Sequence, residues 1–295
     1  MSNKNLRGTG VAIVTPFTKK GEVDSKGLSH VVKHLHNGGV EYIVVLGTTG
    51  ESVTLSKEEK KQVIETVIKA NANKLPLVLG IGGNNTQEVV DTIKHTDLKH
   101  FEAILSVAPY YNKPNQEGYF QHYKAVSAAT KKDIILYNVP GRTGSNVTWE
   151  TQVRIAKAFK NIVATKEASG NMEQIMKVIK NKPKDFMVIS GDDNLTLPVI
   201  AAGGDGVISV VANAFPKEYS EMVRLCLKHK FDKAQKLHYS LIDITDQLFA
   251  DGNPGGIKYA LSLLKKCEAH VRLPLCEPND KVKEQLAQLI KNYRS

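Results

Sequence analysis

A lysine in uncharged surroundings is the first candidate for chemistry in this sequence. Lys166 stands in the segment IVATKEASG, and the residues from Ile162 that precede it carry no charge. A lysine held in an apolar interior loses hydration, which disfavours its ammonium form and leaves a neutral amine that can attack a carbonyl to form a Schiff base. The structural alternative is a side chain whose head reaches solvent or pairs with the adjacent Glu167.

A pair of hydroxyls between glycines is the second candidate. The segment GTTGES, residues 47–52, contains Thr48 and Thr49. Backbone N–H groups turned toward one point in such a loop make a cradle for a carboxylate or a phosphate. Glycine and threonine also form ordinary tight turns, so both interpretations stay open.

Aromatic and basic residues follow two further apolar runs. ILYNVPGRTG carries Tyr137 and Arg142, and APYYNKP carries Tyr110 and Tyr111. A tyrosine can serve as general acid or base, and a guanidinium can hold a substrate carboxylate through two hydrogen bonds. The alternative is that the tyrosines only pack and that the arginine pairs with a surface acid.

The elements that must position these residues repeat along the chain. Short β-branched apolar runs alternate with amphipathic segments, as in parallel strands that are covered by helices. Eight βα units in this order predict a (β/α)8 TIM barrel of the α/β class. The expected strands are VAIVTPF from Val11, YIVVLG from Tyr42, LPLVLGIG from Leu75, FEAILSVA from Phe101, DIILYNV from Asp133, IVATKEA from Ile162, FMVISG from Phe186 and GVISVV from Gly206.

The pattern changes after the eighth expected strand. Residues 216–294 show only helical segments, interrupted by glycines and prolines. We expect residues 1–215 to form the barrel core, and residues 216–295 to form the last barrel helix and a helical C-terminal extension. Active sites of such barrels lie at the carboxyl ends of the strands, where the candidate residues stand.

Composition narrows the classes of partner. The net charge of +10 would suit nucleic acid only if the cations were clustered. They occur instead as short pairs on expected helix faces without interleaved aromatic residues, so we expect no nucleic-acid partner. No run approaches the roughly 20 apolar residues of a membrane helix, and no signal peptide is expected, which predicts a cytoplasmic protein without membrane contact. Cys226, Cys267 and Cys276 lack CxxC spacing, which argues against disulfides and a zinc site.

Together the motifs resemble those of the dihydrodipicolinate synthase family, within the N-acetylneuraminate lyase superfamily. The resemblance runs over nearly the whole chain and rests on GTTGE, YYN, YNVPGRTG, KEASG, GDD and GVISV. It implies a lyase of the class I aldolase type that condenses pyruvate with L-aspartate 4-semialdehyde in lysine and diaminopimelate biosynthesis. The product would be 4-hydroxy-tetrahydrodipicolinate, and neither a metal nor an organic cofactor would take part. The alternative is another pyruvate aldolase of the superfamily, for N-acetylneuraminate or 2-keto-3-deoxy sugar acids.

The resemblance also assigns roles to individual residues. Lys166 would form the imine, while Thr48, Tyr137 and a Tyr111 that reaches in from a neighbouring subunit would relay protons. A dimer would therefore be required, and a homotetramer is expected. The residues that would bind substrate are Thr49, Arg142, Gly191 and Ile208.

Some members of the family are inhibited by lysine at the dimer interface. Ser52, Asn84, Glu88 and Tyr110 stand at the matching positions as possible allosteric residues, along with Val53. Lys57 and Lys60 stand where sensitive enzymes often carry histidine. Because two extra cations repel cationic lysine, we expect weak or absent inhibition, and a micromolar inhibition constant would contradict this.

Overall fold

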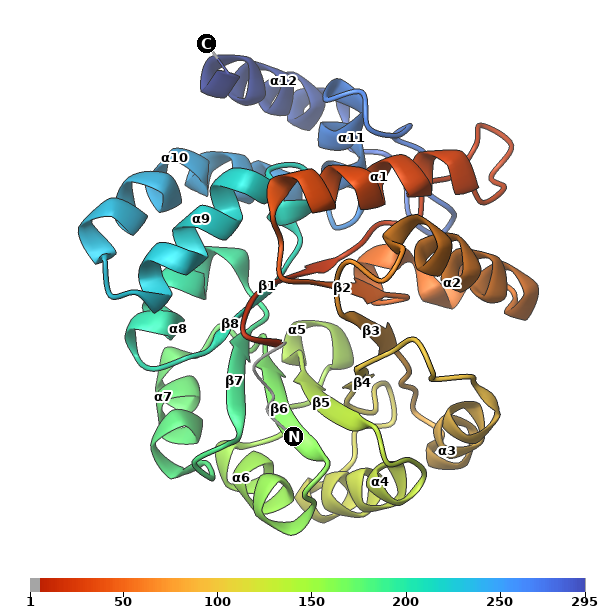
Figure 1. The fold of residues 1–295 in the computed structure, drawn as a ribbon, viewed down its shortest axis with the longest axis vertical. Coiled ribbons are helices and arrows are strands. Elements are labelled where there is room, and N and C mark those ends of the chain that lie inside the picture. The colour runs from red at the N-terminus through yellow and green to blue at the C-terminus, as the bar shows by residue number, and fades with distance from the viewer. Residues whose placement is uncertain (1–5, 295) are drawn as a thin grey trace.

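Eight parallel strands close into one barrel in a computed structural model that describes residues 6–294 (Figure 1). Each strand pairs with its neighbours in chain order, and β1 closes the barrel against β8. The predicted (β/α)8 barrel is therefore confirmed. The strands are β1 Gly8–Ala12, β2 Tyr42–Val45, β3 Leu77–Gly80, β4 Ala103–Val107, β5 Asp133–Asn138, β6 Ile162–Glu167, β7 Met187–Ser190 and β8 Gly206–Ser209.

Alternation along the strands divides the apolar side chains into two layers. Side chains such as Val44, Ile135 and Ile208 meet inside the barrel. Their chain neighbours, such as Ile43 and Val207, point outward and join the larger layer beneath the helices. Because both faces of each strand are buried, the strands read as continuous apolar runs in the sequence.

The first strand lies earlier than the sequence predicted. The run that begins at Val11 was expected to form it, whereas β1 begins at Gly8 and ends at Ala12. Its glycines gave no apolar signal, yet one of them is required by packing, because a Cβ on Gly10 would lie 2.2 Å from the ring of Tyr42. The large side chain on β2 thus fills space that a side chain on β1 would occupy.

A ring of helices encloses the barrel (Figure 1). The helix after each strand is, in order, α1 Ser25–Gly38, α2 Lys57–Asn71, α3 Thr86–His95, α4 Gln116–Ala128, α6 Trp149–Ala158, α7 Met172–Asn181, α8 Thr196–Ala201 and α9 Pro216–Leu227. The four-residue α5, Pro140–Thr143, lies within the loop between β5 and α6. Helix α2 begins with a complete capping box formed by Ser56 and Glu59.

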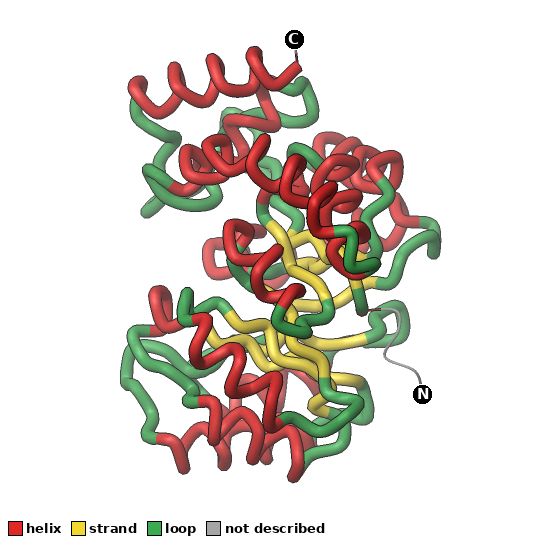
Figure 2. Tube along the Cα trace, turned by 90° about the vertical axis from the view of Figure 1, so that its left-hand side faces the viewer, coloured by secondary structure: helices red, strands yellow, loops and turns green. Residues whose placement is uncertain are grey.

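Three further helices follow the barrel. They are α10 Phe231–Phe249, α11 Gly255–Leu263 and α12 Asp280–Arg294. Helix α10 packs against α9, while α11 and α12 pack on one another and on α10. Figure 2 shows the C-terminal helix at the edge of the molecule, away from the strands. Within the described residues, no helix combines the length and the apolar character needed to cross a membrane.

Candidate active site

Lys166 lies inside the barrel, directly opposite Tyr137 on the neighbouring strand. The two residues are register partners of β6 and β5, and their side chains are 5% and 6% exposed. The Lys166 Nζ lies 4.2 Å from the centroid of the Tyr137 ring. The first structural alternative, a lysine head in solvent, is therefore wrong for this conformation.

The second structural alternative, an ion pair with the adjacent acid, is also wrong. Glu167 is fully buried on the outer face of β6, where it accepts hydrogen bonds from Asn138, Gln152 and Gln174. Successive residues of a strand point to opposite faces, so the carboxylate of Glu167 and the amine of Lys166 lie on different sides of the sheet. The amine remains inside the barrel, where a small substrate could meet it.

The GTTGES segment forms a tight turn at the end of β2. Thr48–Gly50 form a 3-10 turn (η2), whose Gly50 N–H donates to the Gly47 carbonyl at 3.0 Å. The hydroxyl of Thr15 donates to the Gly50 carbonyl at 2.7 Å and ties the turn to the segment after β1. The first N–H groups of such a turn have no partner within it, so those of Thr48 and Thr49 suit a carboxylate. Thr49 is buried, whereas Thr48 is exposed in the isolated chain.

Asn253 in the C-terminal extension reaches this turn, although the sequence analysis did not single it out. Its Nδ2 donates to the Thr49 Oγ1 at 3.1 Å, across 204 residues of sequence. A hydroxyl that accepts one hydrogen bond keeps its own proton to donate, so this contact suits a Thr49 that donates to a carboxylate. The only signal in the sequence was an Asn-Pro pair in a glycine-rich break, DGNPGG.

A buried ion pair joins the same turn to helix α11. The Nζ of Lys258 lies 2.5 Å from the Oε1 of Glu51, and both side chains are fully buried. Glu51 adopts the left-handed conformation with φ of 51° and also accepts the Arg272 N–H at 3.0 Å. A left-handed glutamate is uncommon and has to be held by its surroundings. The extension therefore fixes the end of the turn that carries both threonines.

Arg142 lies in α5, on the loop that follows Tyr137. Its side chain is exposed, and among the described residues no hydrogen bond or ion pair of its guanidinium is found. The expected alternative, an arginine paired with a surface acid, is therefore wrong. The guanidinium is free to bind an anion at the mouth of the barrel.

Tyr111 is exposed and is not packed into its own barrel. Its side chain is 86% exposed, its φ is 73°, and its N–H donates to the Thr143 carbonyl beside Arg142 at 3.4 Å. In residues 6–294 no hydrogen bond joins the hydroxyls of Thr48, Tyr137 and Tyr111. The expected proton relay is thus not assembled within one chain, and whether a second subunit completes it stays a prediction.

The two remaining expected substrate residues lie on β8 and just after β7. Ile208 is buried inside the barrel, and a Cβ on Gly191 would lie 3.1 Å from the Lys166 Cε. A side chain at position 191 would therefore crowd the lysine. The roles of both residues in substrate binding stay predictions.

Two acids of the GDD motif lie near Lys166, although the sequence analysis gave them no role. Burial raises the pKa of the Asp192 and Asp193 carboxyls, and the charge of Lys166 is among the influences that oppose the rise. Asp193 accepts hydrogen bonds from the Ser209 Oγ at 2.5 Å and the Val210 N–H at 3.1 Å. The hydrogen bonds of Asp193 thus hold the end of β8 and the first residue after it.

The possible allosteric residues follow three neighbouring strands at the same end of the barrel. Ser52 lies after β2, Asn84 and Glu88 lie after β3, and Tyr110 lies after β4. Asn84 and Glu88 are exposed, and Ser52 and Tyr110 are half-buried. The isolated chain does not test lysine binding there, so the expected weak or absent inhibition stays a prediction.

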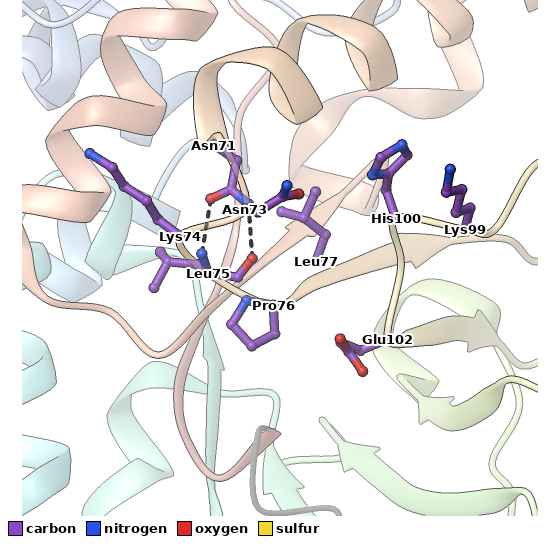
Figure 3. A pocket seen from close by; sticks show the side chains of 9 residues that line it. All are labelled: Asn71, Asn73, Lys74, Leu75, Pro76, Leu77, Lys99, His100 and Glu102. Atoms are coloured by element: carbon purple, nitrogen blue, oxygen red, sulfur yellow. Dashed lines mark hydrogen bonds between the residues drawn. The ribbon is translucent and has the colours of Figure 1, made fainter.

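Two surface hollows lie apart from Lys166. One, of about 280 Å³, is lined by residues between α2 and β3 and by residues just before β4, at the opposite end of the barrel (Figure 3). Its Asn71 donates to the Leu75 carbonyl at 2.8 Å and accepts from the Leu75 N–H, so it closes a turn. The other, of about 360 Å³, lies between α1, α9 and the end of α12. Within the part of the chain that is described, no cluster of three or more His, Cys, Asp or Glu side chains could hold a metal ion.

The chain is similar to known proteins over nearly its whole length. The model of the dihydrodipicolinate synthetase family matches residues 5–293. A 4-hydroxy-tetrahydrodipicolinate synthase of Flavobacterium psychrophilum is 55% identical over 95% of each chain, and that of Parabacteroides distasonis is 49% identical over 98% of this chain and 99% of its own. The solved dihydrodipicolinate synthase of Thermotoga maritima superposes with a TM-score of 0.95 at 40% identity, over 98% of both chains.

Proposed function

This chain belongs to the dihydrodipicolinate synthetase family, and we propose that it condenses pyruvate with L-aspartate 4-semialdehyde to give 4-hydroxy-tetrahydrodipicolinate. The family expected from the sequence motifs is thereby confirmed. The relatives from Flavobacterium psychrophilum and Parabacteroides distasonis are named for this activity, and each matches nearly the whole length of the chain. The reaction is that of a lyase in lysine and diaminopimelate biosynthesis.

One observation carries the chemistry within the site. An amine, Lys166 Nζ, is buried inside a largely apolar barrel and faces the ring of Tyr137 at 4.2 Å. Such an amine is suited to attack a ketone, and a phenol close by is suited to move the protons that the attack requires. No metal or organic cofactor is needed for this scheme.

The steps follow from the nucleophile. The Lys166 amine adds to the ketone of pyruvate, and loss of water gives an iminium. Removal of a proton from the methyl carbon gives an enamine, which attacks the aldehyde of the second substrate. The amine of that substrate then displaces Lys166 as the ring closes, and the free lysine is regenerated. The threonine turn would hold the pyruvate carboxylate, and Tyr137, Thr48 and Tyr111 would carry the protons.

A direct assay separates this activity from its rival. Purified protein is given pyruvate with aspartate semialdehyde, and separately N-acetylneuraminate or a 2-keto-3-deoxy sugar acid. We expect condensation and no cleavage. Cleavage of a sugar acid without condensation would assign the chain to the other aldolase activity.

Arg142 is expected to recognise the carboxylate of the semialdehyde. Its guanidinium is exposed and unpaired among the described residues, and it lies on the loop after Tyr137. Loss of a charge-assisted hydrogen-bonded contact costs about 1.5–3 kcal/mol, so Arg142→Ala should raise the KM for the semialdehyde roughly 10- to 100-fold. The KM for pyruvate should change little. Arg154→Ala, which removes an exposed arginine paired with Glu117, is the matched control.

If Arg142→Ala raised the KM for pyruvate as much as the KM for the semialdehyde, a role confined to the semialdehyde would be contradicted. Arg142→Lys keeps the charge but loses the planar fork. We therefore expect that variant to lie between the wild type and Arg142→Ala.

We infer a homodimer at least, because Tyr111 is 86% exposed and makes no hydrogen bond to Tyr137 or Thr48 within the described residues of its own chain. The resemblance to the family favours two such dimers assembled into a tetramer. The three free cysteines suit the reducing cytoplasm. Sedimentation of the purified protein measures the assembly. A monomer with full activity would contradict the need for a dimer.

Subunit complementation tests where Tyr111 acts. Tyr111→Phe and Lys166→Ala should each be severely impaired, by about 10²-fold or more. When the two are co-expressed, each mixed dimer should contain one site with both Lys166 and a partner's intact tyrosine. We expect recovery of up to about a quarter of wild-type activity, because half of the dimers are mixed and half of their sites are intact. If Tyr111 acts within its own subunit, co-expression will restore nothing.

A further inference from the structure

A buried carboxylate that pairs with no cation among residues 6–294 lies directly behind the proposed nucleophile. Glu167 is 0% exposed. It accepts hydrogen bonds from the Asn138 Nδ2 at 3.1 Å to both oxygens, the Gln152 Nε2 at 2.5 Å, the Gln174 Nε2 at 3.1 Å and the Ser169 N–H at 2.9 Å. All four groups are donors, so the surroundings fit an ionised carboxylate and offer no acceptor to a protonated one.

Burial raises the pKa of the Glu167 carboxyl, and its hydrogen bonds oppose that rise. Removing a carboxylate from water is costly, and an apolar group of similar size often gives a protein of equal or greater stability. Stability alone therefore does not explain why this acid is placed here. A specific geometry that an apolar group could not enforce is the alternative explanation.

The donors belong to a larger network in which every polar side-chain atom has a partner. Asn138 also donates to the Asn146 Oδ1 at 2.8 Å, and Asn146 donates to the Gln174 Oε1 at 2.8 Å. Gln152 also donates to the Val147 carbonyl at 2.9 Å. The network thus links β5, β6, α6, α7 and the loop that precedes α6. A fully satisfied buried network of this kind is rigid and specifies one arrangement.

The network fixes the two strand positions beside the reacting groups. Asn138 and Glu167 are register partners on the outer face, one residue after the partners Tyr137 and Lys166 on the inner face. Neighbouring residues of a strand point to opposite faces, so a shift or rotation of the outer pair also moves the inner pair. The hydrogen bonds of the outer pair therefore determine where the amine and the phenol lie.

The same network closes the loop that carries Arg142. The Asn138 Oδ1 accepts the Val147 N–H at 3.0 Å, while its Nδ2 donates to Asn146. One side chain at the end of β5 thus clamps the far end of the loop 139–146. The three groups assigned to the reaction, Lys166, Tyr137 and Arg142, share this anchor.

We propose that Glu167 is a positioning residue, which holds Lys166, Tyr137 and the Arg142 loop in register for the condensation through its cage of amide donors. It acts through these residues and does not contact the substrate. The proposal rests on the proposed function, because it gives the buried network a role in that reaction.

The test is Glu167→Gln, which keeps size and shape but places an amide N–H₂ against a cage of donors. A misplacement on the order of 1 Å can cost about 10²-fold in rate, so we expect kcat to fall 10- to 100-fold. The apparent KM for pyruvate should change less than about threefold, because the threonine turn lies on another strand. The rate at which borohydride traps the imine on Lys166 should fall together with kcat.

Val188→Ala is the matched control for lost stability. Val188 is fully buried in the outer layer of β7, and its apolar side chain makes no hydrogen bond. At a temperature where both variants are fully folded by circular dichroism, Val188→Ala should keep near wild-type kcat. If Glu167→Gln also keeps near wild-type kcat, or if kcat falls by the same factor in both variants, the positioning role is overturned.

A gentler variant keeps the test informative if Glu167→Gln does not fold. Gln174→Met removes one of the four donors and should lower kcat by a few-fold with the same unchanged KM. An unchanged kcat in that variant would overturn the proposal. If the wild type itself yields no trapped imine, the proposed function fails first. If the wild type is trapped and the variants are trapped at the same rate, only the role of Glu167 fails.

Discussion

Replacement of Lys166 by arginine should abolish the condensation and the covalent trapping of pyruvate. A guanidinium stays protonated at all relevant pH values and cannot add to a ketone, although it keeps the positive charge. We expect a loss of kcat on the order of 10⁴-fold or more, because the amine that would form the Schiff base is removed. The measurement is mass spectrometry after borohydride treatment with pyruvate, together with the steady-state rate.

A second lysine serves as control for that experiment. Lys177→Arg alters an exposed residue that is paired with Glu173 on α7. It should leave both the rate and the trapped adduct unchanged. A trapped adduct in Lys166→Arg at wild-type yield would assign the Schiff base to another residue.

Replacement of Lys258 by methionine should produce the largest loss of stability. The change leaves Glu51 as an uncompensated charge at a site where both partners are fully buried. Breaking such a pair from one side typically costs about 3–5 kcal/mol. Chemical denaturation at one fixed protein concentration measures the free energy of unfolding, since assembly also contributes to the stability.

Two further variants separate the pair from a general effect of lost lysines. Lys283→Met removes a partly exposed lysine that pairs with Glu277 on the same extension, and it should cost no more than about 1 kcal/mol. The double variant Lys258→Met with Glu51→Gln should regain part of the lost stability, because no unpaired charge remains. A Lys258→Met protein as stable as Lys283→Met would show that the pair does not hold the turn.

Loss of the ion pair between Lys258 and Glu51 should also affect the binding of pyruvate. Glu51 ends the turn that carries Thr48 and Thr49, so a loosened Glu51 should weaken the binding of pyruvate before it alters the nucleophile. In Lys258→Met, the KM for pyruvate should therefore rise at temperatures where the protein is still folded. The rise in the KM for pyruvate distinguishes Lys258→Met from Glu167→Gln, for which we expect a fall in kcat.

The local pattern of the sequence was sufficient to predict the barrel and the strand end on which each candidate residue lies. Lys166 and Tyr137 were each expected at the carboxyl end of a parallel strand, and Arg142 on the loop that follows Tyr137. Strands β6 and β5 and helix α5 place them there. This succeeds because alternating and continuous apolar runs record burial locally, residue by residue. The start of the first strand was predicted wrongly, because Gly8 and Gly10 have no side chain and so add nothing to the apolar pattern.

The sequence by itself determined the eight-stranded order, the C-terminal helices and the residue types available for Schiff-base chemistry. Only the tertiary structure decided that Glu167 faces away from Lys166 and that Asn253 and Lys258 hold the threonine turn. The physical reason is distance along the chain. Contacts such as Thr49 with Asn253 join segments that are 204 residues apart, and neither segment carries a local pattern that identifies its partner.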